Sequence, residues 1–84
     1  MSALSDLPNI GKVLENHLLR IGIKTPEQLC NIGAEDTFIR IRMQVDPTIC
    51  LHMLYGIQGA IDGVRYTLLH DDVKQKLKTL FSTL

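Results

Sequence analysis

The stretch that decides the fold lies at residues 7–12 and reads LPNIGK; its pattern returns at residues 29–33 as LCNIG. Both copies read Leu-x-Asn-Ile-Gly, and a helical pattern follows each of them. Asn and Gly tolerate the positive φ angles that tight turns use, while the Ile can pack into a core beneath the turn. The two copies therefore predict two tight turns between short helices.

Outward from these turns, apolar residues recur at the spacing of helices. Residues 1–6 are expected to be a flexible lead-in, or one turn at most. Helices are expected at about 11–21, 26–31, 34–45 and 47–62, with a last helix from a cap at 70–72 to residue 84. Thr25 is a good N-cap, and the proline that follows it suits the first helical position. No segment alternates in the manner of a strand, so residues 7–84 are predicted to form one all-α domain of five helices.

The helix expected at 47–62 is apolar around nearly its whole circumference, which predicts that it is the buried centre of the domain. Gly56, Gly59 and Gly63 lie on or just after it, and each glycine within a helix costs about 1 kcal/mol relative to alanine. These glycines indicate that another backbone approaches closely. That backbone belongs either to the same domain or to a second copy of the chain, in which case the glycines form a homodimer face.

The size and the charge of the chain limit the kinds of function that it is expected to have. The chain has 84 residues, nine basic and nine acidic side chains, and a net charge of zero. Strong non-specific DNA binding requires a marked positive field, which this balance does not supply. Aromatic residues are only 5% of the chain, so stacking platforms for single-stranded nucleic acid are not expected.

The first turn is nevertheless a candidate phosphate site. Free backbone N–H groups at a helix start can hold an anion, and here the candidate residues are Asn9, Ile10, Gly11, Lys12 and Val13, with Lys24 adding charge. The alternative is that the turn only changes the direction of the chain. The second turn is a weaker site, because Glu35 and Asp36 follow it and repel an anion.

Arg40, Arg42 and Arg65 are a second candidate feature, a basic patch. The alternative is that these arginines are solvated or form ion pairs with Glu35, Asp36 or Asp46, as surface arginines commonly do.

Metal and catalytic chemistry find no support in the sequence. The three histidines and two cysteines, His17, His52, His70, Cys30 and Cys50, lack the spacings of metal sites. No nucleophile lies beside a base in a local signature, so neither an enzyme nor a cofactor is expected. The N-terminus lacks the features of a signal peptide, and no apolar run is long enough to span a bilayer. Two cysteines without a disulfide-rich pattern favour a reduced, cytoplasmic protein.

A family resemblance adds to these inferences. The strings at residues 7–15, 22–29 and 32–34, the arginine pair at 40–42 and the long run at 45–63 resemble the C-terminal domain of the TfoX/Sxy family of competence regulators. The resemblance implies a fold similar to the helix-hairpin-helix and SAM-like five-helix domains. It also implies that full-length members carry a separate N-terminal domain and activate the transcription of DNA-uptake genes in concert with a cyclic-AMP receptor protein. No catalytic residue follows from it. Helix-hairpin-helix domains that bind DNA usually have Gly where this chain has Asn9.

Two functional hypotheses result. The first is a non-catalytic interaction module that regulates transcription or competence through protein contacts, either with the transcription machinery or with a separate TfoX N-terminal-type domain. The alternative is DNA-backbone binding through the hairpin at residues 9–13, which the neutral charge makes a weaker choice.

Overall fold

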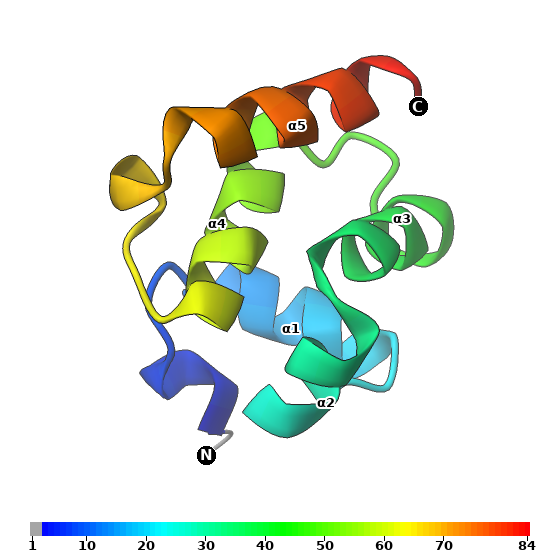
Figure 1. Cartoon of the computed structure of the whole chain (residues 1–84). Coiled ribbons are helices and arrows are strands. Elements are labelled where there is room, and N and C mark those ends of the chain that lie inside the picture. Colours follow the sequence, from blue (N-terminus) through cyan, green and yellow to red (C-terminus); the bar gives the residue numbers. More distant parts are fainter. Residues whose placement is uncertain (1–2) are drawn as a thin grey trace.

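The computed structural model describes residues 3–84, and these residues form helices joined by short turns (Figure 1). Within that range there are five α-helices and no strand, which confirms the predicted all-α, five-helix fold. The α-helices are α1 (Lys12–Arg20), α2 (Pro26–Ile32), α3 (Ala34–Gln44), α4 (Leu51–Asp62) and α5 (Asp71–Ser82), and the two 3₁₀ turns are η1 (Ala3–Asp6) and η2 (Tyr66–Leu68).

Of the two alternatives for the first six residues, the single turn holds for Ala3–Asp6 and the flexible lead-in does not. These residues form η1, which packs against α1, and the Leu4 side chain is fully buried in the core. The Leu7 N–H donates a hydrogen bond to the Leu4 carbonyl at 3.1 Å, which continues the turn toward the hairpin. One buried leucine in a single turn leaves no periodic pattern in the sequence. Residues 1 and 2 lie outside the described residues.

Helix α2 begins as its sequence predicts. The Thr25 hydroxyl accepts a hydrogen bond from the Gln28 N–H at 3.2 Å, and Pro26 occupies the first helical position. The Gln28 side chain in turn accepts from the Lys24 N–H at 2.6 Å, so two backbone donors at the helix start are satisfied. Gly33, at φ 87°, alone separates α2 from α3. This is the tight turn predicted from the second Leu-x-Asn-Ile-Gly copy.

Helix α4 begins four residues later than the expected start at residue 47. The Asp46 carboxylate accepts hydrogen bonds from the Thr48 N–H at 2.9 Å and from the Thr48 hydroxyl at 2.6 Å. The aspartate therefore caps a local turn in place of a helix, and the hydrogen bonds from Thr48 lower the pKa of its carboxyl group. Cys50 takes the N-cap position of α4 instead.

Helix α4 is the centre of the domain, as predicted. It packs against α2, α3, α5 and η2, and Leu54 and Ile57 are fully buried. In Figure 1 it runs through the middle of the molecule, with α5 crossing above it and α3 on one side. The Phe38 ring of α3 contacts the Phe81 ring of α5 edge to face, with ring centroids 5.9 Å apart. This contact packs α5 against the core. No helix in residues 3–84 has the length and apolar character to cross a membrane.

Candidate functional site

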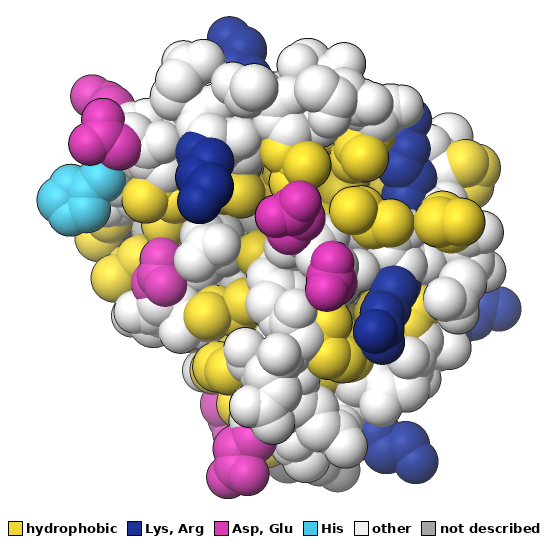
Figure 2. Space-filling view, turned by 45° about the vertical axis from the view of Figure 1, so that its right-hand side comes forward, with side chains coloured by type: hydrophobic (Ala, Val, Ile, Leu, Met, Phe, Trp, Pro, Cys, Tyr) yellow, Lys and Arg dark blue, Asp and Glu magenta, His cyan; other side chains and the backbone are white. Residues whose placement is uncertain are grey.

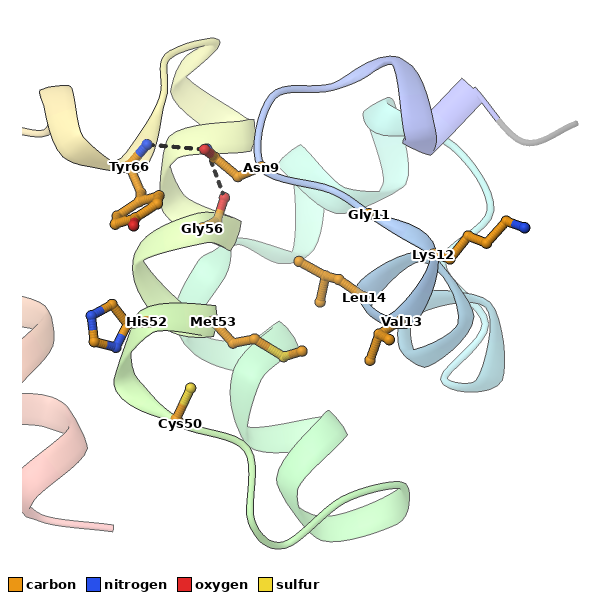
Figure 3. A pocket seen from close by; sticks show the side chains of 10 residues that line it. All are labelled: Asn9, Gly11, Lys12, Val13, Leu14, Cys50, His52, Met53, Gly56 and Tyr66. Atoms are coloured by element: carbon orange, nitrogen blue, oxygen red, sulfur yellow. Dashed lines mark hydrogen bonds between the residues drawn. The ribbon is translucent and has the colours of Figure 1, made fainter.

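The side chain of Asn9 joins the first turn, at residues 9–13, to residues 56–66 by hydrogen bonds. Its amide nitrogen donates to the carbonyl oxygens of Val64, at 2.9 Å, and Gly56, at 3.3 Å. Its amide oxygen accepts from the Tyr66 N–H at 3.0 Å (Figure 3). Asn9 holds this position with φ at 70°, a left-handed conformation that Asn adopts more readily than most residues. The hairpin therefore lies directly on α4 and on the segment that follows α4.

This fastening places the glycine face inside the domain. Gly56 and Gly59 are both buried, and a Cβ at Gly59 would lie 2.6 Å from the Asn9 amide nitrogen and 2.7 Å from the Val64 carbonyl oxygen. Of the two alternatives for the glycine face, a close approach within the domain therefore holds at Gly56 and Gly59, because Asn9 and the segment after α4 cover them and leave no homodimer face there. Gly63 ends α4 in a left-handed conformation at φ 75°.

The predicted phosphate site is only partly available at the hairpin. The Ile10 N–H donates to the Leu7 carbonyl at 3.5 Å and its side chain is in the core, so Ile10 does not offer a free donor, and the Asn9 side chain is engaged as described. Gly11, Lys12 and Val13 remain at the exposed start of α1, where Gly11 is the N-cap and no side chain caps the helix.

Lys24 does not join these residues. It lies beyond the opposite end of α1, a helix of nine residues, and such a helix spans about 13 Å. The length of α1 therefore separates Lys24 from Lys12 at the start of that helix.

A groove lies between the start of α1 and the first half of α4. Its volume is about 370 Å³. Its walls are mostly apolar, and the Val13 and Tyr66 side chains are 60% and 39% exposed. Figure 3 shows Met53 extending from α4 toward α1, which carries Val13 and Leu14. None of the described residues that line the groove is acidic. The lining residues are Asn9, Gly11, Lys12, Val13, Leu14, Cys50, His52, Met53, Gly56 and Tyr66.

Aromatic contacts hold one wall of this groove in place. The His52 ring meets the Tyr66 ring edge to face with centroids 6.2 Å apart, and it meets the Tyr55 ring in the same manner at 6.3 Å. Because the Tyr66 N–H also donates to Asn9, the tyrosine is held at both its backbone and its ring. Sequence reasoning missed Cys50, Met53 and Tyr66 as site residues, since their role depends on contacts between distant parts of the chain.

The predicted basic patch does not form as one unit. Arg40 and Arg42 lie on α3, while Arg65 lies in the segment between α4 and η2, which Figure 1 shows on the opposite side of the molecule. The Arg42 guanidinium lies 5.9 Å from the centroid of the Phe81 ring, a cation–π contact rather than the expected ion pair. On the face drawn in Figure 2, lysine and arginine side chains are scattered singly among hydrophobic and acidic ones.

The cysteines, the histidines and the acidic side chains of residues 3–84 lie apart from this groove or singly within it. Cys30 and Cys50 are free and exposed, and no group of three or more His, Cys, Asp or Glu side chains in this range could hold a metal ion. His17 and Asp46 approach to 3.7 Å and link α1 to the segment after α3. A second hollow beside the α2–α3 turn carries Glu35 and Asp36 on its wall, which disfavours an anion there.

The fold and the groove define a small all-helical domain, in which the turn at residues 9–13 is bound to the central helix α4 beside an apolar groove. The chain belongs to the TfoX C-terminal domain family, whose model matches residues 1–81. This confirms the resemblance inferred from the sequence.

Individual relatives agree with this assignment. The chain is 32% identical over 74 residues to the DNA transformation protein TfoX1 of Aliivibrio fischeri; the match covers 88% of this chain and 35% of that protein. The chain thus spans about a third of the length of that relative. Two crystal forms of an uncharacterised Listeria monocytogenes protein are 42% identical to it. Their TM-scores are 0.93 and 0.91, with 95% and 94% of this chain and 90% and 96% of those chains covered.

Proposed function

We propose that this chain is a non-catalytic interaction module that takes part in the regulation of competence by contacting another protein through the groove between α1 and α4. The observation that carries the proposal is the apolar character of the groove beside the hairpin. Val13 and Tyr66 are exposed there, and Met53 lies beside them half-buried. Exposed apolar surface gathered in one concavity is typical of a binding site, and full burial of a valine side chain contributes roughly 1.5–3 kcal/mol.

The relatives supply the biological setting of the proposal. The Aliivibrio fischeri relative is named a DNA transformation protein, and the match covers 35% of its length. A protein with this domain thus has other parts that such a groove could contact. We therefore propose two kinds of partner, a separate TfoX N-terminal-type domain or a component of the transcription machinery, and a cytoplasmic location that suits both.

DNA-backbone binding remains the second candidate, and one observation favours it. Gly11 leaves the start of α1 without a side-chain cap, so the N–H groups of the first turn face outward beside Lys12. Two observations weigh against it. The net charge is zero, and the Asn9 side chain and Ile10 N–H are already engaged within the domain. Contact with protein is therefore the better-supported function.

The proposal can be tested by transplanting the domain. The matched segment of the Aliivibrio fischeri TfoX1 protein is replaced by this chain, and the transformation frequency of the host is measured. We expect the chimera to retain transformation and Val13→Glu to reduce it by about tenfold or more, because a charge then stands on the groove wall. Glutamate in the first turn of α1 favours the helix, so this variant should fold normally.

Met43→Glu is the matched control. Met43 is 80% exposed on α3 and does not line the groove, so the same substitution there should leave transformation unchanged. Immunoblots must show equal amounts of all chimeras. A folded chimera that fails to support transformation, or one that Val13→Glu does not affect, would contradict the proposed function.

A further inference from the structure

We propose that the groove binds an acidic amphipathic segment of the partner protein, which inserts an apolar side chain between α1 and α4 and directs carboxylates toward the starts of both helices. This inference rests on the proposed function and specifies the chemistry of the partner. It joins two properties of the groove, the apolar character of its walls and the sign of the charges around it.

The apolar walls require an apolar insert. Val13 and Leu14 of α1 lie on one wall of the groove and Met53 of α4 on the other, and its volume of about 370 Å³ lies at the lower end of the range for ligand pockets. The groove is open, since Val13 is 60% exposed, and it does not enclose an occupant as a small-molecule pocket does. An open apolar groove between helices suits an amphipathic segment that lays one face into it.

The charges around the groove select the polar face of that segment. Among the described residues that line it none is acidic, and Lys12 is a cation at its rim, where its side chain extends away from Met53 (Figure 3). The first turn of α1 does contain Glu15, but Glu15 does not line the groove.

Two helix starts add to the positive field. Gly11 and Cys50 are the N-caps of α1 and α4, both line the groove, and neither side chain caps its helix. Helix N-termini carry partial positive charge and attract carboxylates. The groove is therefore complementary to an apolar side chain flanked by Asp or Glu, and opposed to one flanked by Lys or Arg.

Designed peptides test this preference directly. The probe is a peptide of roughly 15 residues, with leucines at a helical spacing that places them on one face and glutamates elsewhere. One matched peptide replaces every glutamate with lysine, and another replaces every leucine with serine. Binding to the isotope-labelled 84-residue chain is followed by amide chemical shifts in NMR spectra.

We expect the glutamate–leucine peptide to shift the amide signals of Lys12, Val13, Met53 and Tyr66. The lysine peptide should bind about five- to tenfold more weakly, as expected for losing favourable contacts with two helix N-termini. The serine peptide should not bind measurably, and Val13→Glu should weaken the first peptide while Met43→Glu does not.

Three results would overturn the inference: equal or tighter binding of the lysine peptide, undiminished binding of the serine peptide, and shifts confined to residues outside the groove or absent with every peptide. These failures are distinct from failure of the proposed function. If Val13→Glu abolishes transformation by the chimera while no acidic peptide binds, the groove contacts a protein of other chemistry. If the acidic peptide binds but Val13→Glu leaves transformation intact, the groove chemistry is right and the proposed function is wrong.

Discussion

The Asn9 side-chain amide donates a hydrogen bond to the Val64 carbonyl oxygen, 2.9 Å away in space and 55 residues away in the chain. This bond and its companions to Gly56 and Tyr66 join the first hairpin to the central helix and to the segment that follows it. They also bring Tyr66 to the groove, so one asparagine both stabilises the domain and positions a wall of its candidate site.

Two replacements of Asn9 separate the contribution of its side-chain hydrogen bonds from that of its backbone conformation. Asn9→Gly keeps the left-handed backbone accessible but removes three hydrogen bonds, and we expect the free energy of unfolding to fall by about 1–3 kcal/mol. Asn9→Ala should cost about 1–2 kcal/mol more, because alanine also opposes φ at 70°. Urea denaturation followed by circular dichroism measures both values. Equal stability of the alanine and glycine variants would contradict the assigned backbone strain.

The two buried glycines of α4 should respond oppositely to alanine. A Cβ at Gly56 would lie 3.5 Å from the Asn9 Cβ, an ordinary contact, so Gly56→Ala should be neutral or stabilising by up to about 1 kcal/mol. A Cβ at Gly59 would lie 2.7 Å from the Val64 carbonyl oxygen, so Gly59→Ala should be destabilising by about 1–3 kcal/mol. Thermal denaturation of the two variants makes the comparison, and the same sign for both would show that the hairpin is not packed as described.

Acid should weaken the domain partly through Asp46. Hydrogen bonds from Thr48 lower the pKa of Asp46 below its ordinary value of 3.8. A carboxyl group with a lowered folded-state pKa stabilises the fold above the ordinary value, and this contribution is lost as the pH falls through the lowered pKa. Thr48→Val removes the side-chain hydrogen bond to Asp46. As the pH falls from about 5 to about 2, we therefore expect the free energy of unfolding to decrease less in this variant than in the unmodified chain. Urea midpoints across this range provide the measurement, and identical pH profiles would exclude the contribution.

The DNA alternative makes its own prediction about Gly11. If α1 holds a phosphate, duplex DNA should bind at low salt, weaken steeply as salt rises, and fail to bind Gly11→Glu. The substitution is structurally permitted, because a Cβ at Gly11 would meet nothing within 4 Å. The net charge is zero, and the Asn9 side chain and the Ile10 N–H already form hydrogen bonds within the domain. We therefore expect fluorescence anisotropy to detect no binding of duplex DNA even at low salt. Salt-sensitive binding that Gly11→Glu abolishes would reverse the order of the two proposed functions.

The site was less predictable than the helices around it. The turn at Asn9 and Gly11 was visible in the sequence because Asn and Gly have distinctive backbone preferences. Its partners were not visible, since Val64 and Tyr66 show no local signal for a hydrogen bond to residue 9. Leu4 was missed for a related reason: a single turn is too short to show periodicity. Asp46 was misassigned because a cap of a local turn and a cap of a helix begin with the same residues.

The sequence by itself determined the local structure of this protein: the all-α class, the turns at Asn9 and Gly33, the Thr25 cap and the central position of α4. Each of these follows from backbone preference or from apolar periodicity, which act within a few residues. Only the tertiary structure decided what the LPNIGK stretch contacts. It turned the glycine face inward, separated Lys24 and Arg65 from the residues grouped with them, and formed a groove from α1, α4 and Tyr66. The physical reason is that hydrogen bonding and packing join residues more than fifty positions apart, and such pairings depend on the whole arrangement of helices.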